Sequence, residues 1–207
     1  MAMVGDVSFP PHITTTKPLS LVGHGITEVE LHSQRHKFTA VGVYIDPKII
    51  THLQQWKGKS GMELAEDNAI FDRVISAPVD KYLRIVVTKE IKGIQYGVEL
   101  VRAVKDKVVA EHKYGDEEDM ALVEIMEFFR FRPLNKDSVL TFSFLATSNI
   151  AEIGFSSQGY GDDMTTMKVL NRNAVEAMKK WYLGGTKAYS PSTILSLANT
   201  LASELSK

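Results

Sequence analysis

The sequence predicts an α+β fold in which helices pack on one face of a mainly antiparallel sheet. Strand-like stretches come first, helical stretches occupy the middle of the chain, and further strands and helices follow. The regular strand–helix alternation that is typical of parallel sheets is absent from this sequence. The 207 residues contain no internal repeat and no linker, so we expect one domain that spans residues 1–207.

The first part of the chain, residues 7–45, is predicted to form strands. Its Val-, Ile- and Thr-rich runs are separated by prolines and by a Gly-His-Gly triplet at 23–25, where we expect a turn. In the stretch FTAVGVYI, residues 38–45, side chains alternate between the two faces of a strand. Thr39 is the one polar residue on a face otherwise made of Val and Ile, which raises the question of whether it lines a site.

The remaining elements follow from helical periodicity and from β-branched runs. Asp46-Pro47 supplies an N-cap and a first-turn proline, and Ser190-Pro191 does the same for the last helix. A hairpin is expected around Ser148-Asn149. Helices are predicted over 47–56, 60–77, 94–108, after the acidic cluster 116–119, 173–184 and 190–205, and strands over 82–91, 138–147, 151–157 and 165–171.

The composition excludes several classes of function. The chain has no cysteine, so it holds no disulfide, no zinc–thiolate site and no thiol nucleophile. Its formal net charge is −1 at pH 7, so no basic excess favours nucleic acid or an anionic membrane surface. No stretch is long and apolar enough to span a membrane, and the N-terminus lacks the features of a secretory signal or a plastid transit peptide. We therefore expect a cytoplasmic protein that reaches the endoplasmic reticulum surface only through partners.

No cluster of residues indicates a metal, a cofactor or a nucleophile. His32 and His36 lie four apart in a predicted strand, which separates them by about 13 Å and prevents them from sharing a metal. The acidic pair Asp162-Asp163 fits a turn better than paired catalytic carboxylates, because adjacent strand residues point to opposite faces. Nucleophile elbows and phosphate-binding glycine loops are also missing. We expect no metal and no cofactor.

Three hydroxyl groups are the remaining candidates for a site. Thr39 lies on an apolar strand face, Tyr96 in the first turn of a predicted helix and Tyr182 in the last turn of another. A buried hydroxyl without a partner costs about 1–3 kcal/mol, so each of them must be satisfied. Two interpretations stay open: the groups ring a pocket for a phenolic or other aromatic ligand, or they are three separately satisfied core hydroxyls.

Several sequence words occur in a fixed order along the chain: KFTAVGVYID, HLQQWKGKS, KEIKGIQYG, WYL and YSPSTI. Together they resemble the plant chalcone isomerase family, and more narrowly its chalcone isomerase-like branch, called type IV, which lacks isomerase activity. The resemblance covers about residues 6–204. It implies the open-faced sandwich of that family, with a mainly antiparallel sheet and helices on one face.

The resemblance also implies a kind of chemistry. The true isomerases of the family close a 2′-hydroxychalcone to a flavanone, and the attacking phenolate belongs to the substrate itself. In the family an arginine holds this phenolate beside a lysine, and threonine and tyrosine hydroxyls polarise the ketone. An asparagine and a further threonine or serine bind the other ring.

Only the two hydroxyls of that set are kept in this sequence. Thr39 and Tyr96 match the family's threonine and tyrosine. The positions of the arginine, the lysine, the asparagine and the ring-binding hydroxyl carry Thr27, Val87, Ala103 and Tyr182. The resemblance therefore implies no catalytic residue, and it implies ligand-binding positions at Thr27, Thr39, Tyr96, Ala103 and Tyr182.

Without either cation, we expect negligible isomerase activity. The resemblance implies a non-catalytic, monomeric protein that assists flavonoid biosynthesis by binding chalcone synthase and promoting production of the correct chalcone. Binding of chalcone or flavanone in the old cleft is a further expectation. Two alternatives stay open: an active chalcone–flavanone isomerase, favoured by Thr39 and Tyr96, and a fatty-acid-binding member of the same superfamily, opposed by the missing arginine. As a further alternative, the shared sequence motifs reflect the fold alone and imply no shared function.

Overall fold

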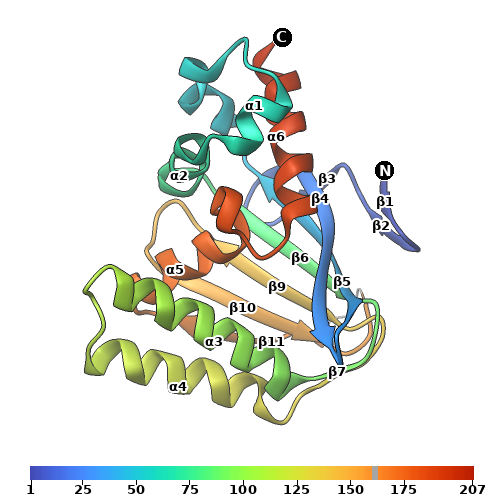
Figure 1. Ribbon diagram of the computed structural model, residues 1–207, viewed down its shortest axis with the longest axis vertical. Coiled ribbons are helices and arrows are strands. Elements are labelled where there is room, and N and C mark those ends of the chain that lie inside the picture. Colours follow the sequence, from blue (N-terminus) through green and yellow to red (C-terminus); the bar gives the residue numbers. More distant parts are fainter. Residues whose placement is uncertain (160–162) are drawn as a thin grey trace.

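One curved antiparallel sheet of seven strands organises the protein, which a computed structural model describes over residues 1–159 and 163–207 (Figure 1). The strand order is β11-β10-β9-β6-β5-β4-β3, and all neighbours are antiparallel. The strands are β3 (His12–Thr14), β4 (Pro18–Leu31), β5 (Gln34–Ile45), β6 (Lys81–Val87), β9 (Val139–Phe144), β10 (Ala151–Ser156) and β11 (Thr165–Val169). Two short ribbons pair β1 (Ala2–Val4) with β2 (Val7–Phe9), and β7 (Ile91–Lys92) with β8 (Pro133–Leu134).

The α-helices gather on one face of this sheet (Figure 1). They are α1 (Gly61–Glu66), α2 (Asn68–Ser76), α3 (Gly93–Ala110), α4 (Asp116–Arg130), α5 (Arg172–Leu183) and α6 (Pro191–Leu205). Helix α3 packs against both α4 and α5, and α6 runs along β4. The predicted α+β class, with helices on one face of a mainly antiparallel sheet, is confirmed.

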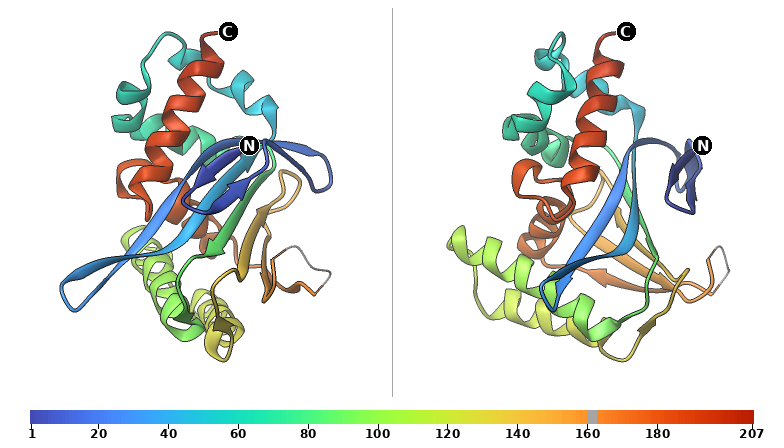
Figure 2. Two further views of the ribbon diagram at one scale, coloured as in Figure 1. Left: turned by 90° about the vertical axis from the view of Figure 1, so that its right-hand side faces the viewer. Right: turned by 45° about the vertical axis from the view of Figure 1, so that its right-hand side comes forward.

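The sheet is buried on both faces. The main core lies between the sheet and the helices, and the alternation in β5 sends Val41, Val43 and Ile45 into it. The other face carries a smaller core that is covered by the N-terminal ribbon of β1 and β2 (Figure 2). Its buried residues are Phe9, Leu19, Ala40, Tyr44, Val86 and Val139.

The prediction of a turn at residues 23–25 was wrong, because β4 continues through them. A Cβ atom on Gly25 would lie 2.5 Å from the backbone nitrogen of Thr193, and one on Gly23 would lie 3.0 Å from the Cβ of Leu197. Glycine at these positions lets the backbones of β4 and α6 approach closely, which is its other common use in a strand.

This close approach lets hydroxyls of α6 bond to the backbone of β4. The Ile26 amide donates to Ser192 Oγ at 3.0 Å, and the His24 amide donates to Ser196 Oγ at 3.0 Å. Ser190 Oγ donates to the Ile26 carbonyl at 2.5 Å. Strand β3 pairs only with residues 18–20 of β4, so these hydroxyls satisfy backbone groups that the neighbouring strand does not reach.

Two further local predictions differ from the structure. His32 and Ser33 have φ angles of 51° and 63° and form the turn between β4 and β5, whereas the sequence had placed His32 within a strand. Residues 47–56 form two short 3-10 helices, η1 (Pro47–His52) and η2 (Gln54–Trp56). In a 3-10 helix each amide donates to the carbonyl three residues earlier, and such helices are common as short connectors. The predicted N-cap is confirmed, because the Asp46 side chain accepts from the Lys48 amide.

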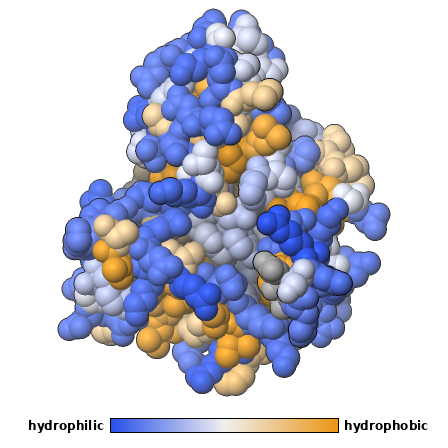
Figure 3. Space-filling model, viewed as in Figure 1, coloured by the Kyte–Doolittle hydropathy of each residue, from blue (hydrophilic) through white to orange (hydrophobic). Residues whose placement is uncertain are grey.

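Apolar residues are scattered over the surface among hydrophilic ones, with some of them low on the face formed by α3 and α4 (Figure 3). On α4, Met120 and Val123 are 66% and 55% exposed, and Phe131 after the helix is 84% exposed. None of the described helices is both long and apolar enough to cross a bilayer. Asp162, one half of the acidic pair considered above, lies outside the described residues.

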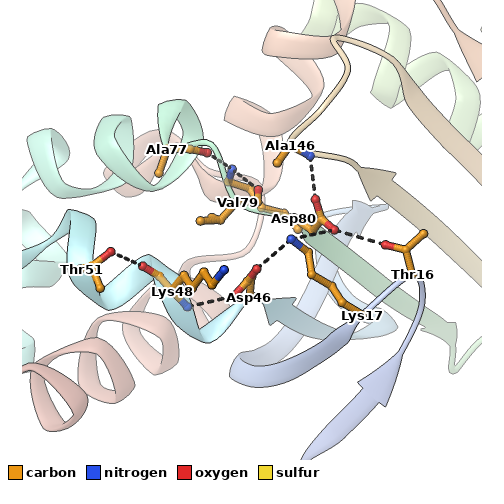
Figure 4. A network of polar contacts seen from close by, with 10 residues as sticks. Thr16, Lys17, Asp46, Lys48, Thr51, Ala77, Val79, Asp80 and Ala146 are labelled. Atoms are coloured by element: carbon orange, nitrogen blue, oxygen red, sulfur yellow. Dashed lines mark hydrogen bonds and ion pairs between the residues drawn. The ribbon is translucent and has the colours of Figure 1, made fainter.

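A polar junction ties the N-terminal strands to the rest of the sheet (Figure 4). Lys17, which precedes β4, bridges the carboxylates of Asp46 and Asp80 at 2.9 and 3.5 Å. Asp80 also accepts from the Ala146 amide at 2.7 Å, between β9 and β10. Asp46 and Asp80 are 4% and 5% exposed, so both carboxylates depend on these partners.

We expect Asp46→Asn to lower the free energy of unfolding by about 1–3 kcal/mol at pH 7, because it removes a buried charged hydrogen-bond acceptor. Burial alone would raise the pKa of Asp46, but the Lys48 amide and the Lys17 ammonium hold it below its ordinary value. A lowered folded-state pKa stabilises the protein above the unfolded pKa of about 4, and this stability is lost as the pH falls through the folded pKa.

Urea denaturation at pH 7 and at about pH 3 measures both effects, and the difference between wild type and Asp46→Asn should shrink at the lower pH. Asp106→Asn, on the exposed surface of α3, is the matched control and should change stability by less than about 0.5 kcal/mol. A deficit of equal size at both pH values would contradict the assignment.

Candidate functional site

Thr27, Thr39 and Val87 lie side by side across β4, β5 and β6. Thr27 pairs with Thr39 in the register of β4 and β5, and Thr39 pairs with Val87 in the register of β5 and β6. Directly paired residues point to the same face of a sheet, and Val87 is part of the main core. The positions where the resemblance expects an arginine, a threonine and a lysine therefore form one row, and in this chain that row carries no charge.

The hydroxyls of Thr27 and Thr39 are hydrogen-bonded to each other. Both residues are 2% exposed. Thr39, the one polar residue on its face of FTAVGVYI, thus has a buried partner on the neighbouring strand. A threonine at position 27 satisfies Thr39 but cannot hold a phenolate as a guanidinium does.

Tyr96 and Tyr182 form a second pair, between α3 and α5. Their hydroxyl oxygens are 2.5 Å apart, and both residues are buried. The ring of Tyr96 lies against Phe129 at a centroid distance of 5.2 Å, and that of Tyr182 lies against Phe142 at 5.6 Å. The bulk of Tyr182, at the position of a smaller ring-binding residue in the family, is thus accommodated inside the main core.

Burial determines the protonation of these phenols. It raises the pKa of Tyr96 and of Tyr182 well above their ordinary value, and the proximity of the two hydroxyls raises that of Tyr182 further. Burial also raises the pKa of Tyr189 to about 12. All three tyrosines are neutral near pH 7, so they can donate or accept hydrogen bonds but cannot act as bases.

The structure therefore brings the five predicted binding positions together only in part. Thr27 pairs with Thr39, and Tyr96 pairs with Tyr182. Ala103 lies two turns after Tyr96 on α3, packs against the main core and offers no hydrogen bond from its side chain. The three hydroxyls that the sequence singled out are all hydrogen-bonded in the core, Thr39 to Thr27, and Tyr96 and Tyr182 to each other.

An apolar groove of about 390 Å³ opens beside Tyr96, and we call it the Tyr96 groove. It lies between the β4–β5 hairpin, the segment after β6 and the first turns of α3. Its lining residues are Val29, Phe38, Lys89, Glu90, Ile91, Ile94, Gln95, Tyr96, Val98, Glu99 and Tyr189. Among the described residues that line it, Tyr96 is the only one of the five predicted positions.

Phe38, Lys89 and Tyr189 are groove residues that the sequence analysis missed. The Lys89 ammonium lies 5.9 Å from the centre of the Phe38 ring and 3.3 Å from Nδ1 of His36. The Thr88 and Lys89 amides both donate to the Phe38 carbonyl, which turns the chain away from the end of β6. The strand predicted over 82–91 would put Lys89 on the same face as Val87, but β6 ends at Val87 and the turn that follows sets the position of Lys89.

Flat aromatic or apolar ligands suit this groove chemically. Phe38 and Tyr189 offer aromatic faces, Ile94 and Val98 are 40% and 37% exposed along α3, and Lys89 adds one cation. The described residues contain no group of side chains that could hold a metal ion.

The fold is shared with a protein of known structure. A fatty-acid binding protein from Arabidopsis thaliana superimposes with a TM-score of 0.73 over 96% of this chain and 95% of its own, at 14% sequence identity. At this identity the likeness defines the class, a curved antiparallel sheet with helices on one face, and not the ligand.

The family follows from the sequence comparison. The family model described as chalcone-flavanone isomerase matches residues 4–205, and the chain belongs to this family. It is 56% identical to chalcone isomerase-like protein 2 of Humulus lupulus, over 100% of this chain and 98% of that protein. It is 30% identical to chalcone–flavanone isomerase 2 of Lotus japonicus, covering 99% and 93%, and 27% identical to the isomerase of Gentiana triflora, covering 94% and 88%. The resemblance to the chalcone isomerase-like branch is confirmed.

We expect Tyr182→Phe to lower the free energy of unfolding by about 1–3 kcal/mol, because the buried Tyr96 hydroxyl loses its partner. The double variant Tyr96→Phe/Tyr182→Phe leaves neither hydroxyl alone, so its loss should be smaller than the sum of the single losses by about 0.5 kcal/mol or more. A double-mutant cycle in urea measures this difference, and additive losses would show that the two hydroxyls do not depend on each other.

Proposed function

We propose that this protein is a non-catalytic accessory of flavonoid biosynthesis that binds chalcone synthase and promotes production of the correct chalcone. The observation that carries the proposal is the neutral row of Thr27, Thr39 and Val87 in a chain 56% identical to a chalcone isomerase-like protein. We also propose that it is monomeric and cytoplasmic, and that its partners provide any contact with the endoplasmic reticulum.

The argument against catalysis is electrostatic. Ring closure of a chalcone develops negative charge on oxygen, and an enzyme accelerates it by placing fixed positive charge or strong donors there. Here Thr27 and Thr39 are hydrogen-bonded to each other, and so are Tyr96 and Tyr182, so one hydroxyl donor of each pair is already engaged inside the core. Loss of one such donor costs about 10²–10³ in rate in well-studied sites, and both cations of the family set are missing.

The Tyr96 groove supports the second part of the proposal, that the protein holds chalcone or flavanone without converting it. Its aromatic and aliphatic walls fit planar rings, and Lys89 can attract a phenolate oxygen at one side. A ligand bound there would lie beside Tyr96 but outside the neutral row, since Thr27 and Thr39 are buried and do not belong to the described lining.

In a stopped-flow absorbance assay with naringenin chalcone, we expect the protein to leave the spontaneous rate of ring closure unchanged. Thr27→Arg should raise the rate by about tenfold or more, because it replaces the hydroxyl that engages Thr39 with a guanidinium on a side chain long enough to extend from the row towards a bound ligand. Thr51→Arg, on the exposed surface of η1, adds the same charge elsewhere and should have no effect. A wild-type rate well above the spontaneous one would establish an active isomerase instead.

Co-purification with chalcone synthase tests the proposed partner. We expect a stable complex, and we expect the synthase to release more chalcone and less lactone by-product when this protein is present. An unrelated protein of similar size serves as the control for crowding. The absence of both a complex and a change in product partition would refute the accessory role.

A fatty-acid-binding function is the second candidate, and the fold shared with the Arabidopsis fatty-acid binding protein favours it. The arginine that the family resemblance assigns to carboxylate binding is absent at Thr27, although Lys89 offers a cation in the Tyr96 groove. Native mass spectrometry of the purified protein distinguishes the two candidate functions, since a co-purified lipid would favour fatty-acid binding over the accessory role.

A further inference from the structure

A second pocket lies at the opposite end of β6 from the Tyr96 groove. It has a volume of about 230 Å³ and is formed by the segment after α2, the start of β6, the turn between β9 and β10, and the first turns of α5. Lys81 begins β6 and Val87 ends it, which places the two ends of the strand about 20 Å apart. We call this second hollow the Lys81 pocket.

Positive charge predominates in the walls of the Lys81 pocket. Arg172, Glu176 and Lys179 are spaced four and three residues apart on α5, so they share one face of the helix. Lys179 pairs with Glu176 at 2.7 Å. The described lining of the pocket therefore carries three cations, Lys81, Arg172 and Lys179. It carries one carboxylate, Glu176, which is the partner of Lys179.

Lys81 is an unusual residue to find at the base of such a pocket. It is 3% exposed, and its ammonium donates to the carbonyls of Ala77 at 2.9 Å and Val79 at 3.0 Å. An ammonium has three donors, so one remains after these two bonds. No ion pair formed by the described residues includes Lys81, although its neighbour Asp80 points into the junction with Lys17 (Figure 4).

The electrostatic cost of this arrangement is visible in the titration of Lys81. Burial, together with the nearby Lys179 ammonium, lowers the pKa of Lys81 to about 8. At neutral pH the side chain is thus mostly charged in a place that disfavours positive charge. A bound anion would relieve this cost, because it would add negative charge beside Lys81 and accept the third hydrogen bond of the ammonium.

We propose that the Lys81 pocket binds a small oxyanion, phosphate or a carboxylate, through the Lys81 and Lys179 ammoniums and the Arg172 guanidinium. Its volume admits an anion of that size with a few water molecules, since a water molecule takes about 30 Å³. Charge-assisted bonds from both lysines and the arginine are the contacts that such anions favour. The proposal concerns a site separate from the Tyr96 groove and does not rest on the proposed function.

Isothermal titration calorimetry of the full chain with inorganic phosphate, sulfate and acetate tests the proposal, at constant ionic strength maintained with sodium chloride. We expect saturable 1:1 binding with a Kd of about 1–10 mM for at least one of the three anions. Amide resonances of residues 77–81 should shift along the same saturation curve. Absence of saturable binding below about 50 mM of every anion would overturn the proposal.

The pH dependence adds a second readout, for which sulfate is the probe because its charge is constant over the range. Asp80, Arg172, Glu176 and Lys179 are the other charged groups around Lys81. Raising the pH from 6.5 to 9.5 removes the Lys81 charge, so sulfate should bind at least about threefold more weakly at the higher pH. A Kd that does not weaken would exclude Lys81 as a ligand.

Matched variants separate this pocket from general surface charge. Lys179→Gln and Lys81→Met should each weaken binding by about tenfold. Lys180→Gln is the control, because Lys180 is the next residue of α5 but pairs with Glu111 outside the pocket. If Lys81→Met does not fold, Lys179→Gln and Arg172→Gln carry the test. Equal loss in Lys180→Gln would show a non-specific charge effect and refute the site.

Discussion

The pairing of β5 with β4 on one side and β6 on the other is the constraint on which the structure depends. Because residues 38–45 of β5 are buried on both faces of the sheet, the register of β5 with each neighbour cannot slip without moving core residues to the wrong side. That register places Thr27, Thr39 and Val87 in one row, and the same row is where the family resemblance expects its charged groups. The positions where the resemblance expects charge therefore share one location in the sheet, and in this chain that location is neutral.

A neutral row has a structural advantage as well as a functional cost. An arginine and a lysine at this place would need counter-charges or a bound anionic ligand to offset their burial. Threonine paired with threonine, and valine packed in the main core, need neither. The row is thus complete without an anionic ligand, which suits a protein whose proposed role is to bind rather than to convert.

Much of the fold could be predicted from the sequence, because alternation in 38–45 and helical spacing after Gly93 are local signals. The errors arose where one residue type serves two purposes. Glycine at positions 23 and 25 is as consistent with a turn as with the close approach of α6, and only the tertiary structure distinguishes these two explanations. Within the candidate site, the sequence identified Thr39, Tyr96 and Tyr182 as candidate hydroxyls but not their partners. The pairing of Thr27 with Thr39 depends on the register of β4 and β5, and that of Tyr96 with Tyr182 on the packing of α3 on α5. Lys81 gave no signal, because a lysine at the start of a strand is ordinarily exposed.

The hydroxyl contacts between α6 and β4 have a consequence for the life of the chain in the cell. Beyond the short β3, the outer edge of β4 would be an open row of amide and carbonyl groups, the kind of edge that recruits strands from other molecules. Ser192 and Ser196 occupy that edge, and they belong to the last helix of the sequence. During synthesis β4 leaves the ribosome long before α6, so the nascent protein carries an unprotected edge until α6 emerges. Removal of α6 would leave the His24 and Ile26 amides without these partners on an open strand edge, where a strand from a second copy could pair with them.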